Sequence, residues 1–132
     1  MKVTADTNVL IRAVVRDDER QARAADRILK RAEIIAVTLP CLCEFVWVLR
    51  RLYRFDRNDI AAATRELADT AKVTLNRPAV EAGLAVLTAG GDFADGLIAY
   101  EGNWLGAETF ISFDKKAVNL LARQGLQTKL LT

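Results

Sequence analysis

The residues best suited to chemistry in this chain are carboxylates. Asp92 and Asp95 are three positions apart, a spacing that places two like charges on one face of a helix, where they repel. Asp6 ends the first apolar run, Glu44 is embedded in an apolar stretch, and Asp114 follows another apolar run. Carboxylate oxygens are hard ligands that suit Mg²⁺ or Mn²⁺. We therefore expect these acids to converge on a divalent metal.

The absence of histidine excludes several other chemistries. The 132 residues include no His and only two cysteines, Cys41 and Cys43. Ser-His and Cys-His nucleophilic catalysis, the paired-His chemistry of metal-free ribonucleases and a Cys/His zinc site are therefore ruled out. Catalysis would have to use carboxylates, Lys, Tyr or metal-bound water.

Each acid also has a structural interpretation. Asp6 and Asp114 each precede an expected helix and could serve only as N-caps. Asp92 is the clearest cap candidate, and Asp95 would then lie where the helix dipole favours an acid. Glu44 lies too deep in its helix for a cap. We expect it to be buried and to need a partner, either an Arg or a metal shared with the other acids, with the metal favoured.

Composition places the chain among ordinary globular domains. It is 52% hydrophobic, 27% charged and carries a net charge of +2, from 19 basic and 17 acidic residues. We expect one domain over residues 1–132, no membrane span, no signal peptide and a cytoplasmic location. Two groups of basic residues could form either solvated helix faces or phosphate-binding surfaces. The groups are Arg12, Arg16, Arg20, Arg23, Arg27, Lys30 and Arg31, and then Arg50, Arg51 and Arg54.

The pattern of apolar residues predicts strands that alternate with helices. Strands are expected at 2–5, 34–38, 73–75, 109–113 and, as an edge strand, 127–130. Helices are expected from about residue 9 and over 20–30, 40–53, 56–68, 78–87, 92–104 and 115–124. This order predicts an α/β fold, a three-layer sandwich with a mainly parallel, roughly five-stranded sheet.

The elements would bring the acids to one edge of that sheet. Sites in parallel sheets form beyond the carboxyl ends of the strands. Asp6 and Asp114 each lie just past a strand, and Glu44 lies in the first turns after the second strand. Asp95 opens a helix that could face the same edge. Four acids distant in sequence would then share one rim.

Four segments, taken in order, resemble the successive motifs of the PIN-domain nucleases. They are Asp6-Thr7-Asn8-Val9-Leu10, Glu44 after the second strand, Asp92-Phe93-Ala94-Asp95-Gly96-Leu97-Ile98-Ala99, and Ser112-Phe113-Asp114-Lys115-Lys116. The resemblance covers about residues 1 to 125. In its length and compactness, the chain most resembles the VapC toxins of bacterial and archaeal toxin–antitoxin pairs.

The resemblance implies a PIN-like fold and a Mg²⁺- or Mn²⁺-dependent endoribonuclease. It implies a homodimer that a small cognate antitoxin inhibits. Asp6, Glu44, Asp95 and Asp114 match the catalytic and metal-binding quartet, which would hold one or two ions. Attack by water would leave a 3′-hydroxyl and a 5′-phosphate.

Further residues carry over in supporting roles. Asp92 matches an additional acid, and Thr7 and Ser112 match hydroxyl positions beside the metal; Asn8 is a further accessory candidate. Gly96 stands where Ala is commoner in the family, and we expect it to loosen the helix start slightly. Candidates for holding the RNA backbone are Arg12, Arg50, Arg51, Lys115 and Lys116.

Other classes of function remain open. A PIN-fold nuclease that acts on DNA, or in RNA processing outside a toxin–antitoxin pair, would use the same chemistry. A non-enzymatic interaction module would lose acids, whereas this chain has all four. A phosphotransferase with Asp6 as nucleophile is weaker, because Asn8 stands where haloacid-dehalogenase-type phosphatases carry a second Asp.

Overall fold

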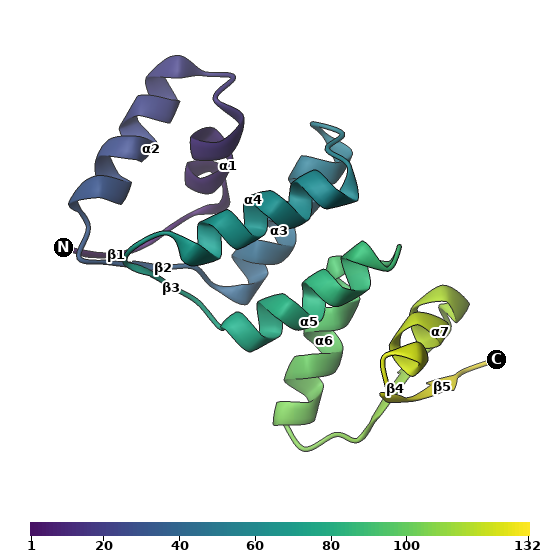
Figure 1. Ribbon diagram of the computed structural model, residues 1–132. Coiled ribbons are helices and arrows are strands. Elements are labelled where there is room, and N and C mark those ends of the chain that lie inside the picture. Colours follow the sequence, from purple (N-terminus) through teal and green to yellow (C-terminus); the bar gives the residue numbers. More distant parts are fainter. The chain divides into compact units, whose positions relative to one another are not determined.

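The chain forms two compact units in the computed structural model, which describes all 132 residues. The first unit is Met1–Asn76 and the second is Arg77–Thr132. In Figure 1 the first unit runs from purple to teal and the second from green to yellow.

The first unit contains three short parallel strands and four helices. Its elements are β1 (Lys2–Thr4), α1 (Thr7–Val15), α2 (Glu19–Arg31), β2 (Ile34–Ala36), α3 (Leu39–Arg51), α4 (Arg57–Asp69) and β3 (Val73–Thr74). The sheet order is β1-β2-β3, with Val3 opposite Ile35 and Ile35 opposite Val73. Helix α1 packs against α2 and α3, and α3 packs against α4.

The caps and the apolar stripe of these helices follow from local sequence. Asp18, Thr38 and Asp56 each accept a hydrogen bond from a backbone N–H in the first turn of α2, α3 and α4 respectively. Pro40 lies in the first turn of α3, where no helical hydrogen bond is lost. The largest buried side chains of the unit are Leu10, Ile11, Ile35, Leu42, Phe45, Leu49 and Ile60.

The second unit contains three helices and a two-stranded parallel sheet. Its elements are α5 (Arg77–Thr88), α6 (Phe93–Trp104), β4 (Thr109–Ser112), α7 (Lys115–Arg123) and β5 (Gln127–Leu130). Strand β4 pairs with β5, with Thr109 opposite Gln127 and Ser112 opposite Leu130. Helices α5 and α6 pack on each other, and α7 packs against both strands.

Helices α5 and α6 approach closely at two glycines. A Cβ on Gly96 would lie 2.4 Å from the carbonyl oxygen of Ala82 and 2.7 Å from the Cα of Gly83. A Cβ on Gly83 would meet the side chains of Leu97 and Phe93. The expectation that Gly96 loosens the start of its helix stays a prediction. The structure adds a reason for the glycine, because its missing side chain lets the two backbones approach closely.

The α/β class and the parallel strands are confirmed, and the elements lie within a few residues of the predicted ranges. The prediction of one roughly five-stranded sheet differs from the structure. Backbone hydrogen bonds define a sheet of three strands and a sheet of two. The strands are only two to four residues long, so each supports few ladder hydrogen bonds. The three-layer sandwich and the single domain over residues 1–132 stay predictions. No helix has the length and the apolar character needed to cross a membrane.

Candidate active site

Asp6 lies between β1 and α1, and its carboxylate makes no capping hydrogen bond and no ion pair. It occupies the N-cap position of α1, yet its side chain accepts no capping hydrogen bond. Its side chain is exposed and forms no ion pair. The interpretation of Asp6 as a simple helix cap is therefore not supported by the contacts of this residue.

Glu44 lies on the solvent-facing side of α3. The prediction that it is buried is wrong, because its side chain is exposed. Its chain neighbours are apolar, but successive residues on a helix point in different directions, and the buried stripe of α3 runs elsewhere. That stripe consists of Cys41, Leu42, Phe45, Val46 and Leu49. Because the Glu44 carboxylate stays in contact with water, it needs no partner within the protein. It is therefore accessible to a ligand.

The thiol of Cys41 is influenced by the charges of both of these acids. Thr7 Oγ1 donates a hydrogen bond to Cys41 Sγ at 3.6 Å, and Sγ donates to the carbonyl oxygen of Ala5 at 3.6 Å. Burial raises the pKa of this thiol most, the hydrogen bond from Thr7 lowers it, and the charges of Asp6 and Glu44 raise it further. The two candidate acids of the first unit, Asp6 and Glu44, therefore both act electrostatically on one buried sulfur atom.

Asp95 is the acid whose ionisation the second unit disfavours. It lies half-buried in the first turn of α6. Burial raises the pKa of its carboxyl group, and the negative charges of Asp92 and Asp114 raise it further. The repulsion between Asp92 and Asp95 was expected from their spacing on one helix face. The structure adds Asp114 as a second acid whose charge acts on Asp95.

Asp92 and Asp114 both act as helix caps. Asp92 Oδ1 accepts a hydrogen bond from the Ala94 N–H at 3.3 Å. Asp114 Oδ1 accepts from the N–H groups of Lys116 and Ala117 at 3.0 and 3.2 Å. Each cap uses a single carboxylate oxygen, so capping and ligand binding by Asp114 are compatible.

The hydroxyl of Ser112 contributes to the position of Asp114. Ser112 Oγ accepts a hydrogen bond from the Asp114 N–H at 2.9 Å, at the point where β4 ends and α7 begins. Thr7 has the corresponding place beside Asp6, and it is buried, with 7% of its surface exposed. Asn8 is exposed at the start of α1.

The basic candidates differ in how they are engaged. Arg12 contacts Asp17 Oδ1 at 2.6 Å through Nη1 and donates to Gln21 Oε1 at 2.7 Å through Nε. Tyr53 completes this cluster by donating from its hydroxyl to Asp17 Oδ2 at 2.8 Å. Arg12 also donates to the Tyr53 hydroxyl at 3.4 Å, so it joins α1 to α2 and to the segment that follows α3. Arg51, Lys115 and Lys116 are exposed and Arg50 is half-buried, and none of the four forms an ion pair.

Sequence reasoning did not find the contacts of Cys41 with Thr7 and Ala5. The signal was its position three residues before Glu44, the spacing that makes two side chains neighbours on a helix surface even when one is buried and the other exposed. The Arg12–Asp17–Tyr53 cluster was missed as well, because its members are up to 41 residues apart and no local pattern joins them.

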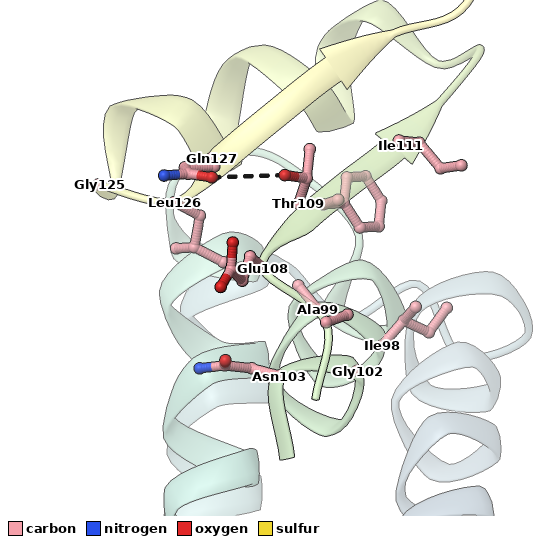
Figure 2. A pocket seen from close by; sticks show the side chains of 12 residues that line it. Ile98, Ala99, Gly102, Asn103, Glu108, Thr109, Ile111, Gly125, Leu126 and Gln127 are labelled. Carbon is pink, nitrogen blue, oxygen red and sulfur yellow. Dashed lines mark hydrogen bonds between the residues drawn. The ribbon is translucent and has the colours of Figure 1, made fainter. Parts of the chain in front are cut away.

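The second unit also has a hollow of about 630 Å³ beside α6, β4 and the turn before β5. Figure 2 shows Ile98, Asn103 and Glu108 around it, with Thr109 donating to Gln127 Oε1 at 3.4 Å. None of the four candidate acids lines this hollow. The hollow is therefore a feature separate from those acids.

The donor set suits a divalent cation. Neither unit contains by itself a group of three or more Asp, Glu or Cys side chains arranged to hold a metal ion. The available donors are nevertheless hard oxygens. Asp6 and Glu44 have no competing ion pair, and the repulsion around Asp95 is the kind that a bound cation relieves.

These features describe an α/β protein with carboxylates just past the ends of β1 and β4. A family model for the PIN domain matches residues 3–120. The chain belongs to the PIN-domain family, whose members are generally metal-dependent nucleases, and it is accordingly assigned as a PIN-domain nuclease. No curated protein matches the chain.

Proposed function

We propose that the protein is a toxin-type endoribonuclease that hydrolyses RNA phosphodiester bonds and is inhibited by a small cognate antitoxin. The family match over residues 3–120 supports a nuclease. The absence of histidine favours carboxylate and metal chemistry over metal-free RNA cleavage. The observation that carries the proposal is the pair of exposed, unpaired carboxylates, Asp6 and Glu44, whose charges both act on the Cys41 thiol.

The metal ligands would be Asp6, Glu44, Asp95 and Asp114, with Mg²⁺ or Mn²⁺ as the ion. When bound, such an ion activates water and stabilises charge on the phosphoryl oxygens. Asp6 and Glu44 offer carboxylates that need not lose another partner first. Asp114 offers Oδ2, because Oδ1 accepts the capping hydrogen bonds. Asp95, whose pKa is raised by burial and by its acidic neighbours, gives up its proton more readily when a cation is close.

Substrate would be held by basic side chains near the acids. Lys115 and Lys116 directly follow Asp114, and both are exposed. Arg51 is exposed on the same helix as Glu44, and Arg50 is its neighbour. These cations would bind phosphates without reading the base sequence. Arg12 is a weaker candidate than the other four, because Asp17 and Gln21 already hold its guanidinium group.

Metal-dependent cleavage is the first test of the proposal. Purified protein should cleave RNA in Mg²⁺ or Mn²⁺, lose this activity in EDTA and regain it when metal is restored. Parallel single-stranded RNA and DNA of the same sequence separate a ribonuclease from the alternative, a PIN-fold nuclease that acts on DNA. Undiminished cleavage in EDTA would overturn the metal mechanism.

The toxin assignment and the homodimer need separate tests. A small gene beside this one, whose product binds the protein and suppresses cleavage, would support the toxin–antitoxin assignment. Exposed Trp47 and Leu52 on and after α3 offer apolar surface for a second copy, with 56% and 65% of their areas exposed. Light scattering at micromolar concentration should show a dimer, and a monomer there would contradict it.

A further inference from the structure

Cys41 links two chain segments that are far apart in sequence. Its sulfur accepts a hydrogen bond from Thr7 Oγ1 and donates one to the carbonyl oxygen of Ala5, both at 3.6 Å. Cys41 and Thr7 are each 7% exposed, and Ala5 is 6% exposed. The thiol therefore acts as both donor and acceptor, and burial shields the two hydrogen bonds from competition by water.

These contacts hold Asp6 from both sides. Ala5 and Thr7 are the residues immediately before and after Asp6. The Asp6 side chain itself makes no capping hydrogen bond that would fix the start of α1. The direction in which its carboxylate points therefore depends on the two flanking residues, and both of them contact the same sulfur atom.

The other end of the link leads to Glu44. Cys41 lies three residues before Glu44 on α3, so the two side chains leave the helix on neighbouring lines. The backbone of Cys41 is held as well, because its N–H donates to Thr38 Oγ1, the N-cap of α3, at 3.4 Å. A shift of Cys41 relative to Ala5 and Thr7 would consequently move Glu44 relative to Asp6.

We propose that Cys41 is a positioning residue that sets the separation of the Asp6 and Glu44 carboxylates through its hydrogen bonds to Thr7 and Ala5. This inference rests on the proposed function, in which these two acids hold a divalent metal. A residue that only filled the core would need the right volume and no hydrogen-bonding capacity. The two roles therefore predict different behaviour for Ser and Ala at this position.

The first experiment compares Cys41→Ala, Cys41→Ser and a matched thiol control, Cys43→Ala, on the same helix. Mn²⁺ affinity is measured by the loss of the free-ion electron paramagnetic resonance signal at a temperature where every variant is folded. Cys41→Ala should weaken Mn²⁺ binding roughly 10- to 100-fold, as loss of a group that orients a metal ligand does. Cys41→Ser, which retains a donor and an acceptor, should recover most of this affinity, and Cys43→Ala should bind as wild type does.

Other results of that experiment would overturn the proposal. A core residue without a positioning role would give variants with lowered thermal midpoints but wild-type Mn²⁺ affinity. Equal losses in Cys41→Ala and Cys41→Ser would show that hydrogen bonding at this position does not matter. In RNA cleavage, the positioning role predicts a fall in kcat with little change in KM, because Cys41 does not contact the substrate.

A second experiment needs no metal and therefore separates failure of this inference from failure of the proposed function. Unfolding constants are measured in EDTA for Thr7→Val, Cys41→Ser, Cys41→Ala and the double variant Thr7→Val/Cys41→Ala. The contact predicts that Thr7→Val and Cys41→Ala have a combined effect smaller than the product of their separate effects. Multiplicative effects would overturn the link. Coupling in EDTA together with no Mn²⁺ binding by wild type would refute the metal site while the link stands.

Should Cys41→Ala fail to fold, Cys41→Ser and Thr7→Val carry the same test. Thr7→Val removes the donor to the sulfur and keeps the shape of the side chain. It should lower Mn²⁺ affinity in the same direction as Cys41→Ala. Wild-type affinity in a folded Thr7→Val protein would contradict the proposed hydrogen-bonded link.

Discussion

The acids of the two units are held in different ways. In the first unit, Asp6 and Glu44 are exposed, and Asp6 makes no capping hydrogen bond. In the second unit, Asp92 and Asp114 cap helices and Asp95 is half-buried between their charges. The first pair makes no such structural contact, whereas two of the three acids in the second unit help to hold their own helices. The comparison teaches that an acidic side chain can be free of structural contacts in one unit and can hold the fold in another.

The largest expected effect tests Asp6 and Glu44, whose carboxylates form no capping hydrogen bond and no ion pair. Asp6→Asn and Glu44→Gln should each reduce RNA cleavage roughly a hundredfold or more, since each removes a charge that acts on the reacting centre. Thermal midpoints should stay close to that of wild type, because neither side chain makes a cap or an ion pair. Asp56→Asn is a matched control, since Asn still caps α4 and no charge of the proposed site is lost. Wild-type cleavage by either variant would remove that acid from the site.

A glycine pair on α6 tests how tightly the second unit holds Asp95. Gly96→Ala should lower the free energy of unfolding by about 1–3 kcal/mol, because the new Cβ meets the backbone of α5. Gly102→Ala lies on the same helix with open space around it and should raise that free energy by up to about 1 kcal/mol. Denaturant titrations of both variants measure the two effects. A stabilising Gly96→Ala would show that α5 and α6 are not packed this closely.

Asp114 tests whether capping and metal binding can be separated in one residue. Asp114→Ala should lower the free energy of unfolding by roughly 1 kcal/mol through loss of the α7 cap. Asp114→Asn keeps the cap and should leave stability nearly unchanged while it reduces cleavage. Thermal melts and cleavage rates of both variants decide the question. If Asp114→Asn cleaves RNA as wild type does, Asp114 is only a cap.

The smallest expected effect concerns Asp95 and its dependence on pH. Its folded pKa lies above the ordinary value of 3.8, because of burial and the charges of Asp92 and Asp114. This group therefore stabilises the fold below its unfolded pKa, and the contribution is lost as pH rises through the folded pKa. In EDTA at neutral pH, Asp95→Asn should melt slightly higher than wild type, and the difference should shrink toward acid pH.

Added Mn²⁺ should reverse that order, because metal binding stabilises the wild-type fold by mass action. Asp92→Asn is the control and should change less, since Asn still caps α6. Asp95 would be a purely structural acid, favoured by the helix dipole, if Asp95→Asn melted lower in EDTA and Mn²⁺ shifted both proteins equally.

Apolar periodicity and cap residues alone determined most of the secondary structure. The helices begin at or within two residues of the positions that the caps and apolar runs predict, since these signals act over one helical turn. The absence of histidine and the order of the acidic motifs likewise pointed to a metal-dependent nuclease, and the PIN-domain match agrees. Chemistry that depends only on residue types and their spacing can be inferred from the sequence.

Tertiary structure alone decided the surroundings of these residues. Glu44 is exposed although its sequence neighbours are apolar, because helix geometry turns it away from the buried stripe. Gly96 is required by a contact with α5, and Cys41 joins residues 34 and 36 positions away. Such contacts depend on which surfaces pack together, a property of the whole chain that no local window contains. For the same reason, the sequence identified the candidate acids, whereas only the tertiary structure showed which of them are free of contacts, which cap helices and which repel one another.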